Sequence, residues 1–145
     1  MKIVIDTNVV VSGVFFRGPS SRVLEAVVDG VIEVSASPEI IDEYRRIVQF
    51  VAVKKGGKYA GQFRTDAFSG FLDMLEVVFP KRRFKVCRDP KDDMFIDCAV
   101  EAKALCIVSG DDDLKSLGTV EGIEVITAAE FCSRFLESGI DTPNI

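Results

Sequence analysis

Short apolar runs alternate along the chain with amphipathic segments, and this alternation restricts the fold more than any other feature. The runs are short and rich in β-branched residues, which is typical of the strands of a buried parallel sheet. We expect five such strands: "KIVID" (2–6), "IEVSA" (32–36), "FKVCR" (84–88), "LCIVS" (105–109) and "GIEVIT" (122–127). The pattern predicts an α/β fold of three layers, α/β/α, with a central and mainly parallel sheet of about five strands.

Helix-start and helix-stop residues lie in the intervals between these strands. Ser20 or Ser21 and Gly30 bound the first predicted helix, and Ser37 with Pro38 begins the second, which runs to residue 51. Further helices are predicted at 65–78, 93–104 and 128–138. We expect loops after the first strand and at the glycine-rich stretch 54–62, and a single domain over 1–138 with a loose tail at 139–145.

The composition excludes histidine-dependent catalysis and argues against a zinc site and a membrane span. The chain contains no histidine, which excludes Ser-His-Asp and Cys-His catalysis. Its four cysteines form no C-x-x-C pair, so we interpret them as small buried hydrophobes in a reducing cytosol rather than as a zinc site. No run approaches the roughly 18 apolar residues of a membrane span, and Asp6 and Asn8 interrupt the apolar N-terminus. We therefore expect a cytoplasmic protein that does not contact the membrane.

Carboxylates gather at the ends of the apolar runs. Asp6 ends the first strand, the triplet Asp111 to Asp113 follows the strand at 105–109, and Asp93 begins a helix that carries Asp97 one turn later. The carboxyl ends of parallel strands meet at one edge of a sheet, so these acids are expected to converge there. The other interpretation is local: Asp111 or Asp113 caps a short helix, and the remaining acids of the two clusters, Asp89, Asp92 and Asp112, are turn residues.

Glu43 is a further candidate for this group. On a helical wheel of residues 40–51 it lies between Phe50 and Ile47, at the edge of the apolar arc. A carboxylate directed toward the core requires a partner. The alternative is that Glu43 extends to solvent or pairs with an arginine.

Convergent carboxylates repel one another strongly. Two like charges ~5 Å apart, at an effective dielectric constant near 20, repel by about 3 kcal/mol. Cations offset this repulsion, and oxygen ligands without histidine or cysteine favour hard ions. The acids therefore predict a site for Mg²⁺ or Mn²⁺.

In order and local sequence, four segments resemble the PIN-domain nucleases, including the VapC-type toxins of prokaryotic toxin–antitoxin pairs. They are "IVIDTNVVVSG", "SPEIIDEYRRIV", "DPKDDMFIDCAVEAKA" and "LCIVSGDDDL". The resemblance implies a PIN-like fold and Mg²⁺- or Mn²⁺-dependent cleavage of RNA. It implies that the metal is held by Asp6, Asp93, Asp111 and Asp113, with Asp97 as an accessory acid. Glu43 would complete the catalytic set by holding the metal or orienting the attacking water, and an antitoxin protein would be a partner.

Basic residues are segregated, although the formal net charge is −5. Eleven of the eighteen lie in two windows without acids, a pattern that suits a surface tracking RNA phosphates. The windows hold Arg45, Arg46, Lys54, Lys55, Lys58 and Arg64, and then Lys81, Arg82, Arg83, Lys85 and Arg88. A solvated helix face with a loop is the alternative. The apolar segment 64–79 suits either the core or the interface of a homodimer or higher oligomer.

Other functions fit the sequence less well. An Asp-nucleophile phosphatase requires D-x-D at the first strand, where this chain has Asn8 in the third position. A receiver domain requires a phosphoacceptor near the middle of the chain, where none is found. A catalytically silent module that binds RNA or a partner on a PIN scaffold remains the main alternative.

Overall fold

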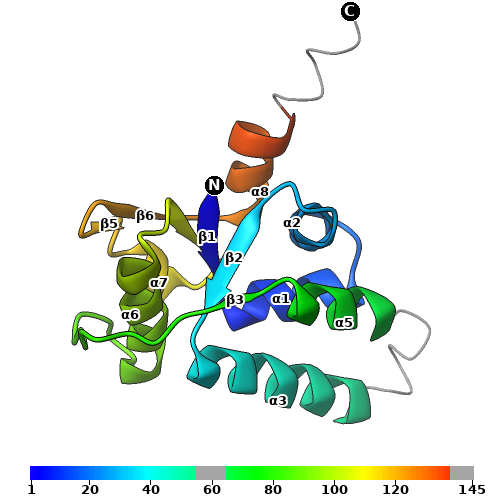
Figure 1. Cartoon of the computed structure of the whole chain (residues 1–145), viewed down its shortest axis with the longest axis horizontal. Helices are drawn as coiled ribbons and strands as arrows, with labels where there is room; N and C mark the ends of the chain where they lie inside the picture. Colours follow the sequence, from blue (N-terminus) through cyan, green and yellow to red (C-terminus); the bar gives the residue numbers. More distant parts are fainter. Residues whose placement is uncertain (55–64, 138–145) are drawn as a thin grey trace, which may run out of the picture.

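The computed structural model describes residues 1–54 and 65–137, and its centre is a six-stranded sheet (Figure 1). The strand order is β3-β2-β1-β4-β6-β5, and every neighbouring pair is parallel except β5 with β6. The expectation of an α/β fold with a mainly parallel sheet is therefore confirmed. The strands are β1 (Lys2–Ile5), β2 (Glu33–Ala36), β3 (Glu76–Val77), β4 (Cys106–Val108), β5 (Thr119–Val120) and β6 (Ile123–Ile126).

Helices cover both faces of the sheet and produce the three layers. Helix α6 packs against β1, β2 and β4, whereas α1, α2 and α5 pack on one another on the other side of the sheet (Figure 1). The longer helices are α1 (Thr7–Phe15), α2 (Pro19–Val28), α3 (Pro38–Lys54), α5 (Thr65–Asp73) and α6 (Asp93–Ala102). The shorter ones are η1 (Pro90–Asp92), α7 (Asp112–Lys115), α8 (Ala128–Phe131) and the π-helical turn η2 (Cys132–Leu136).

The central strands β1 and β4 are buried apart from Lys2 at the start of β1, which explains their nearly continuous apolar sequence. Their register aligns Ile5 with Val108 and Val108 with Ile126, so that β1, β4 and β6 end at the same level. Two hydrogen bonds extend this alignment past the strands: the Asp6 amide donates to the Val108 carbonyl, and the Ser109 amide donates to the Ile126 carbonyl, each at 2.9 Å. The sheet therefore places Asp6 and Ser109 side by side at its carboxyl edge.

The expectation of a loop after the first strand is wrong, because Thr7–Phe15 forms α1. Three consecutive valines favour a strand on local propensity, and packing overrides that preference. The backbone carbonyl of Asp6 accepts the amides of Val9 and Val10 and begins the helix. Gly13 allows α1 to approach α2 closely, since a Cβ at this position would lie 2.6 Å from the Leu24 side chain.

Two other predicted elements differ from the structure. The predicted helix 65–78 ends at Asp73, and the edge strand β3 follows it at Glu76–Val77. Residues 84–88 are not a strand, because side chains of α6 accept the amides of Phe84, Val86 and Cys87 in place of a neighbouring strand.

The remaining predicted elements are found within a few residues of their expected bounds. Residues 55–62 of the predicted break and the predicted tail 139–145 lie outside the described residues. Among the described residues, no helix has the length and apolarity to cross a bilayer. All four cysteines are free thiols, and three of them are buried.

Candidate metal centre

Asp6 lies at the centre of the carboxyl edge and is 4% exposed. Its Oδ2 accepts a hydrogen bond of 2.8 Å from the Ser109 hydroxyl. Burial raises the pKa of Asp6, and the nearby carboxylates of Asp111 and Glu43 raise it further, against the lowering effect of the Ser109 hydrogen bond. Asp6 is thus a buried acid that faces other acids across the ends of two adjacent strands.

Ser109 connects β1 to the acidic turn that follows β4. Its side chain is fully buried, donates to Asp6 and accepts the amide of Asp111 at 2.9 Å. A single hydroxyl therefore fixes both Asp6 and the backbone of the turn 109–113. Sequence reasoning gave this residue only a minor role.

Asp92, Asp111 and Asp113 bring one carboxylate oxygen each to within 4.8 Å of one another. All three side chains are partly buried. Burial raises the pKa of Asp92 to about 7, and the negative charges of Asp111, Asp6, Asp89 and Asp113 contribute to this shift. Burial is the larger cause of this shift, and the neighbouring carboxylates add to it in the same direction.

Local hydrogen bonds hold two of these acids in place. Asp111 caps α7, and its Oδ1 accepts the amides of Asp113 and Leu114 at 2.7 and 3.4 Å. Asp92 ends η1, which begins where Oδ1 of Asp89 accepts the Lys91 amide at 3.0 Å. The capping role that the sequence suggested for Asp111 is therefore present, and it positions the carboxylate within the group.

Glu43 reaches the same edge from α3. Its Oε2 accepts a short hydrogen bond from the Thr7 hydroxyl, one residue after Asp6. Its charge also raises the pKa of Asp6. Helix α3 is anchored nearby, because the buried Tyr44 hydroxyl donates to the Ile5 carbonyl. Glu43 thus faces the acids across the start of α1.

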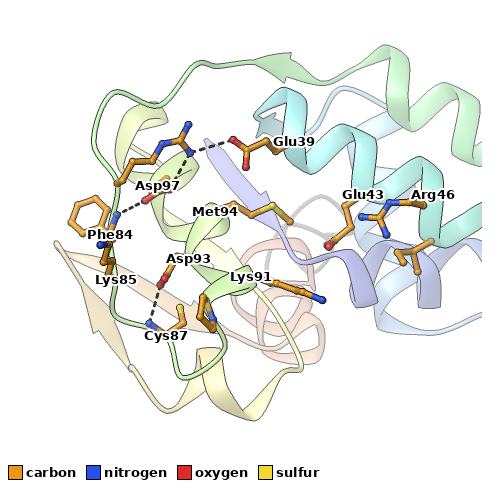
Figure 2. Close-up of a pocket in the computed structure, with 13 residues that line it drawn as sticks. Glu39, Glu43, Arg46, Phe84, Lys85, Cys87, Lys91, Asp93, Met94 and Asp97 are labelled. Carbon is orange, nitrogen blue, oxygen red and sulfur yellow. Dashed lines mark hydrogen bonds and ion pairs between the residues drawn. The ribbon is translucent and has the colours of Figure 1, made fainter.

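Asp93 has a different environment from that of its neighbour Asp92. Its Oδ1 accepts the amides of Val86 and Cys87 at 3.1 and 2.9 Å, so the carboxylate holds the preceding loop (Figure 2). Asp97, one turn later, accepts the Phe84 amide at 2.7 Å. Asp93 and Asp97 are not in the three-carboxylate group found among the described residues. Sequence reasoning assigned Asp92 to the turn, and it is Asp92 that the structure brings to the acids.

The helical spacing of the acids distinguishes Asp93 from Asp92 in the sequence itself. Asp93, Asp97 and Glu101 recur every four residues and form one row on α6, so they face the same neighbour. That neighbour is the loop 81–87, whose Lys81 amide reaches Glu101 at 3.0 Å. Asp92 precedes the helix and lies outside this row.

A basic side chain approaches the acids as well. Arg88 Nη1 lies 3.4 Å from Asp113 Oδ1, and the Arg88 side chain is 83% exposed. An ion pair this exposed contributes little to stability. It nevertheless places an exposed positive charge beside the carboxylates.

Comparison with known proteins is consistent with this geometry. The sequence model of the PIN domain matches residues 2–113, a span that ends at Asp113 and holds every acid described above. The chain therefore belongs to the PIN-domain family. The "Uncharacterized protein MJ1680" of Methanocaldococcus jannaschii is 34% identical over 121 residues, which cover 81% of this chain and 75% of the relative. No solved structure gives a significant match.

PIN domains are generally nucleases that depend on divalent metal ions, and the acidic group suits such an ion. The donors are carboxylate oxygens, which hard cations prefer. Cys87 is not in the candidate group found among the described residues, and burial and the hydrogen bond to Asp93 raise the pKa of its thiol to about 12. The residues at this edge therefore fit Mg²⁺ or Mn²⁺ and do not fit a thiolate-bound metal.

Proposed function

We propose that the chain is a Mg²⁺- or Mn²⁺-dependent ribonuclease that hydrolyses RNA phosphodiester bonds at this edge of the sheet. One observation carries the proposal: Asp92, Asp111 and Asp113 approach one another to within 4.8 Å, beside the buried Asp6. Like charges at such distances destabilise the fold unless a cation or protons compensate them. The family supports the same conclusion, since PIN domains are generally nucleases.

The roles of the residues follow from their positions. Asp6, Asp92, Asp111 and Asp113 would hold the metal, with Asp92 in the role that the sequence interpretation gave to Asp93. When bound, Mg²⁺ or Mn²⁺ supplies Lewis acidity to the phosphate and lowers the pKa of a bound water. Glu43 borders the cavity beside this edge, where its carboxylate is placed to orient the attacking water and accept its proton.

The supporting side chains preorganise these groups. Thr7 holds the Glu43 carboxylate, and Ser109 holds Asp6. Both donors are buried, so the carboxylates keep their orientation without relying on water. Such fixed supporting contacts tune the affinity of metal sites.

Cleavage of a labelled single-stranded RNA, with Mn²⁺ and with excess chelator, tests the proposal. We expect cleavage only with metal, and none from Asp6→Asn, which removes one charge and one ligand while Ser109 retains an acceptor. Metal-independent cleavage would contradict the proposed site. RNA binding without cleavage at any metal concentration would instead support the catalytically silent module.

We further propose that the protein is a cytoplasmic toxin and that an antitoxin protein blocks its activity. The support is the resemblance of the four motif segments to VapC-type toxins. Expression of the wild-type chain alone should arrest growth, and the Asp6→Asn variant should not. Normal growth with active, soluble enzyme would remove the toxin role and leave the nuclease.

A homodimer is also proposed, through the segment that follows α5. In this segment Leu75 and Val78 pack on the core, whereas Met74, Val77 and Phe79 are exposed. Because β3 is an edge strand, this patch lies where a second copy can pack against it.

A further inference from the structure

Two hydrogen bonds connect helix α3 to the corner where β1 ends and α1 begins. The Glu43 carboxylate accepts the Thr7 hydroxyl, and the Tyr44 hydroxyl donates to the backbone carbonyl of Ile5. Consecutive residues of α3 are thus bonded to the two chain neighbours of Asp6, one on each side of it. Figure 2 shows the Glu43 side chain projecting from α3 toward this corner. The position of Glu43 relative to Asp6 therefore depends on these two bonds.

The two bonds have different surroundings. Glu43 lines a cavity of about 870 Å³ beside the acids, so its bond to Thr7 lies at the candidate site itself. Tyr44 is fully buried, and its ring packs on Phe71 with the ring centroids 5.8 Å apart. The core therefore sets the direction of the Tyr44 hydroxyl. Because Tyr44 is buried away from RNA, any effect it has on a reaction must pass through another residue.

The phenol of Tyr44 remains a hydrogen-bond donor near neutral pH. Burial raises its pKa well above the ordinary value, and the charges of nearby groups, Asp6 and Glu43 among them, raise it further. The influence of both carboxylates on one phenol shows that Tyr44 lies close to each of them. Since the phenol keeps its proton, it takes no part in proton transfer, and its contribution is geometric.

The sheet holds the β1 side of the Tyr44 bond. The Asp6 amide donates to the Val108 carbonyl at 2.9 Å, and Asp6 Oδ2 accepts the Ser109 hydroxyl at 2.8 Å. Helix α3, in contrast, lies at the margin of the molecule, where it packs along α1 (Figure 1). Loss of the Tyr44 hydroxyl should therefore displace α3 rather than Asp6.

We propose that Tyr44 is a positioning residue for RNA cleavage: its bond to the Ile5 carbonyl holds the Glu43 carboxylate where it can orient the attacking water beside Asp6. This inference rests on the function proposed above. A general base must lie within hydrogen-bond reach of the proton that it removes. A misplacement of about 1 Å can slow a reaction roughly 100-fold, so a bond that fixes α3 against β1 affects the rate directly.

Tyr44→Phe tests the proposal, because it removes one oxygen and leaves a ring that packs on Phe71. In Mn²⁺-dependent cleavage of a labelled single-stranded RNA, we expect kcat to fall at least about tenfold and KM to stay within about twofold of the wild type. Mn²⁺ affinity, measured by calorimetry, should also stay within about twofold, because Tyr44 acts on Glu43 and not on the acids that hold the metal. An unchanged kcat, or a loss of Mn²⁺ affinity as large as that of Asp6→Asn, would overturn the proposal.

A double-mutant cycle shows whether Tyr44 acts through Glu43. Glu43→Gln lacks the proposed proton acceptor, but it should retain slow cleavage because the metal still activates its bound water. In this background, Tyr44→Phe should change kcat by less than about twofold, since the group that it positions is already disabled. A second loss as large as that in the wild-type background would show that Tyr44 acts independently of Glu43, against the proposal.

Ser37→Ala is the matched control for the loss of a buried hydroxyl on the same helix. Ser37 is 2% exposed, and its hydroxyl accepts the Ile40 amide at 3.3 Å, so the substitution weakens the first turn of α3. This bond is local to the start of the helix and does not join it to β1. Its kcat should stay within about twofold of the wild type. Equal losses in Ser37→Ala and Tyr44→Phe would assign the effect to general weakening of α3 and reject a positioning role.

Amide hydrogen exchange in chelator tests the bond without a catalytic assay. Tyr44→Phe should accelerate exchange in the central turns of α3, residues 43–48, at least about fivefold, while β4 exchanges as in the wild type. Unchanged exchange in α3 would contradict the inference. Failure of the proposed function is a separate result: the wild type then takes up no Mn²⁺ or cleaves RNA in chelator, whatever the exchange rates in α3.

Discussion

The hydroxyl of Ser109 donates to Asp6 Oδ2 at 2.8 Å and joins residues 103 positions apart in the sequence. The same oxygen accepts the amide of Asp111 at 2.9 Å. The ends of β1 and β4 are thereby connected through one buried side chain. This connection fixes the buried Asp6 carboxylate and the backbone of the acidic turn relative to each other.

Ser109→Ala should therefore weaken both stability and metal binding. It leaves the Asp111 amide and one Asp6 oxygen without their buried partner, a loss of about 1–3 kcal/mol in the free energy of unfolding. Loss of a supporting contact should reduce Mn²⁺ affinity about 10- to 100-fold. Chemical denaturation and calorimetry measure the two effects. Ser116→Ala is the control, since its hydroxyl caps an exposed carbonyl and should change neither quantity much.

Asp92→Asn should abolish most of the activity, whereas Asp112→Asn should not. Asp92 belongs to the three-carboxylate group, and the Asp112 side chain is 97% exposed and pairs only with Lys115 among the described residues. Removing a ligand should cost more than removing a supporting contact, so we expect a loss of at least about 100-fold in metal-dependent cleavage. Equal rates for the two variants would remove Asp92 from the proposed site.

Asp93 should respond differently to two substitutions. Asp93→Ala leaves the Val86 and Cys87 amides without an acceptor and should cost about 1–3 kcal/mol of stability. Asp93→Asn keeps one carbonyl oxygen and should cost less. In folded protein, Asp93→Asn should take up Mn²⁺ nearly as the wild type does. If Asp93→Asn loses the metal and Asp92→Asn keeps it, the sequence-based assignment of Asp93 is the right one.

Metal uptake should depend on pH near neutrality. Because the pKa of Asp92 is about 7 in the metal-free protein, Mn²⁺ must displace a proton at pH 6 but not at pH 8. Affinity should rise with pH through this range, and calorimetry in buffers of different ionisation enthalpy should detect proton release at pH 6. In Asp92→Asn, this proton release should disappear.

The raised pKa of Asp92 also affects the stability of the metal-free protein. This stability should fall as the pH rises, whereas the metal affinity should rise. Between the ordinary pKa of 3.8 and about 7, the native state retains a proton that the unfolded chain has lost. The contribution of Asp92 to stability therefore falls as the pH rises through this window. Denaturation midpoints of wild type and Asp92→Asn, measured in chelator, should diverge as the pH increases from 4 to 7.

The dimer can be tested at the edge strand. Phe79 lies two residues after the end of β3 and is 70% exposed, and a charge there should oppose burial in an interface. We expect light scattering to show a dimer for the wild type and a monomer for Phe79→Glu. Val31→Glu, at another exposed apolar residue, should leave the dimer intact. A monomeric wild type at high concentration would contradict the homodimer.

The parts of the fold that could be predicted are those whose local signal and packing agree. Apart from Lys2, the residues of β1 and β4 are apolar and buried, so the sequence pattern alone locates these strands. Helix α1 is different, because its valines favour a strand, whereas the Asp6 carbonyl starts a helix and Gly13 lets that helix pack closely on α2. No local propensity encodes that contact.

The acids of the candidate site divide in the same way, into those placed by the sheet topology and those placed by side-chain contacts. Asp6 and Asp111 end or follow strands of the central sheet, and parallel topology suffices to bring them to one edge. The choice between Asp92 and Asp93 depends on the direction of each side chain at the start of α6. That direction is fixed by the amides of Val86 and Cys87, which a strand prediction at 84–88 had assigned to the sheet.

The attachment of the segment 81–88 to α6 through its main chain has a consequence for the tolerance of substitutions. Since the fold binds the amides of residues 81, 84, 86 and 87, the side chains at Arg82, Arg83 and Lys85 are free to drift without unfolding the protein. Substitutions at these surface positions should therefore change the charge beside the acidic group without detaching the segment from α6.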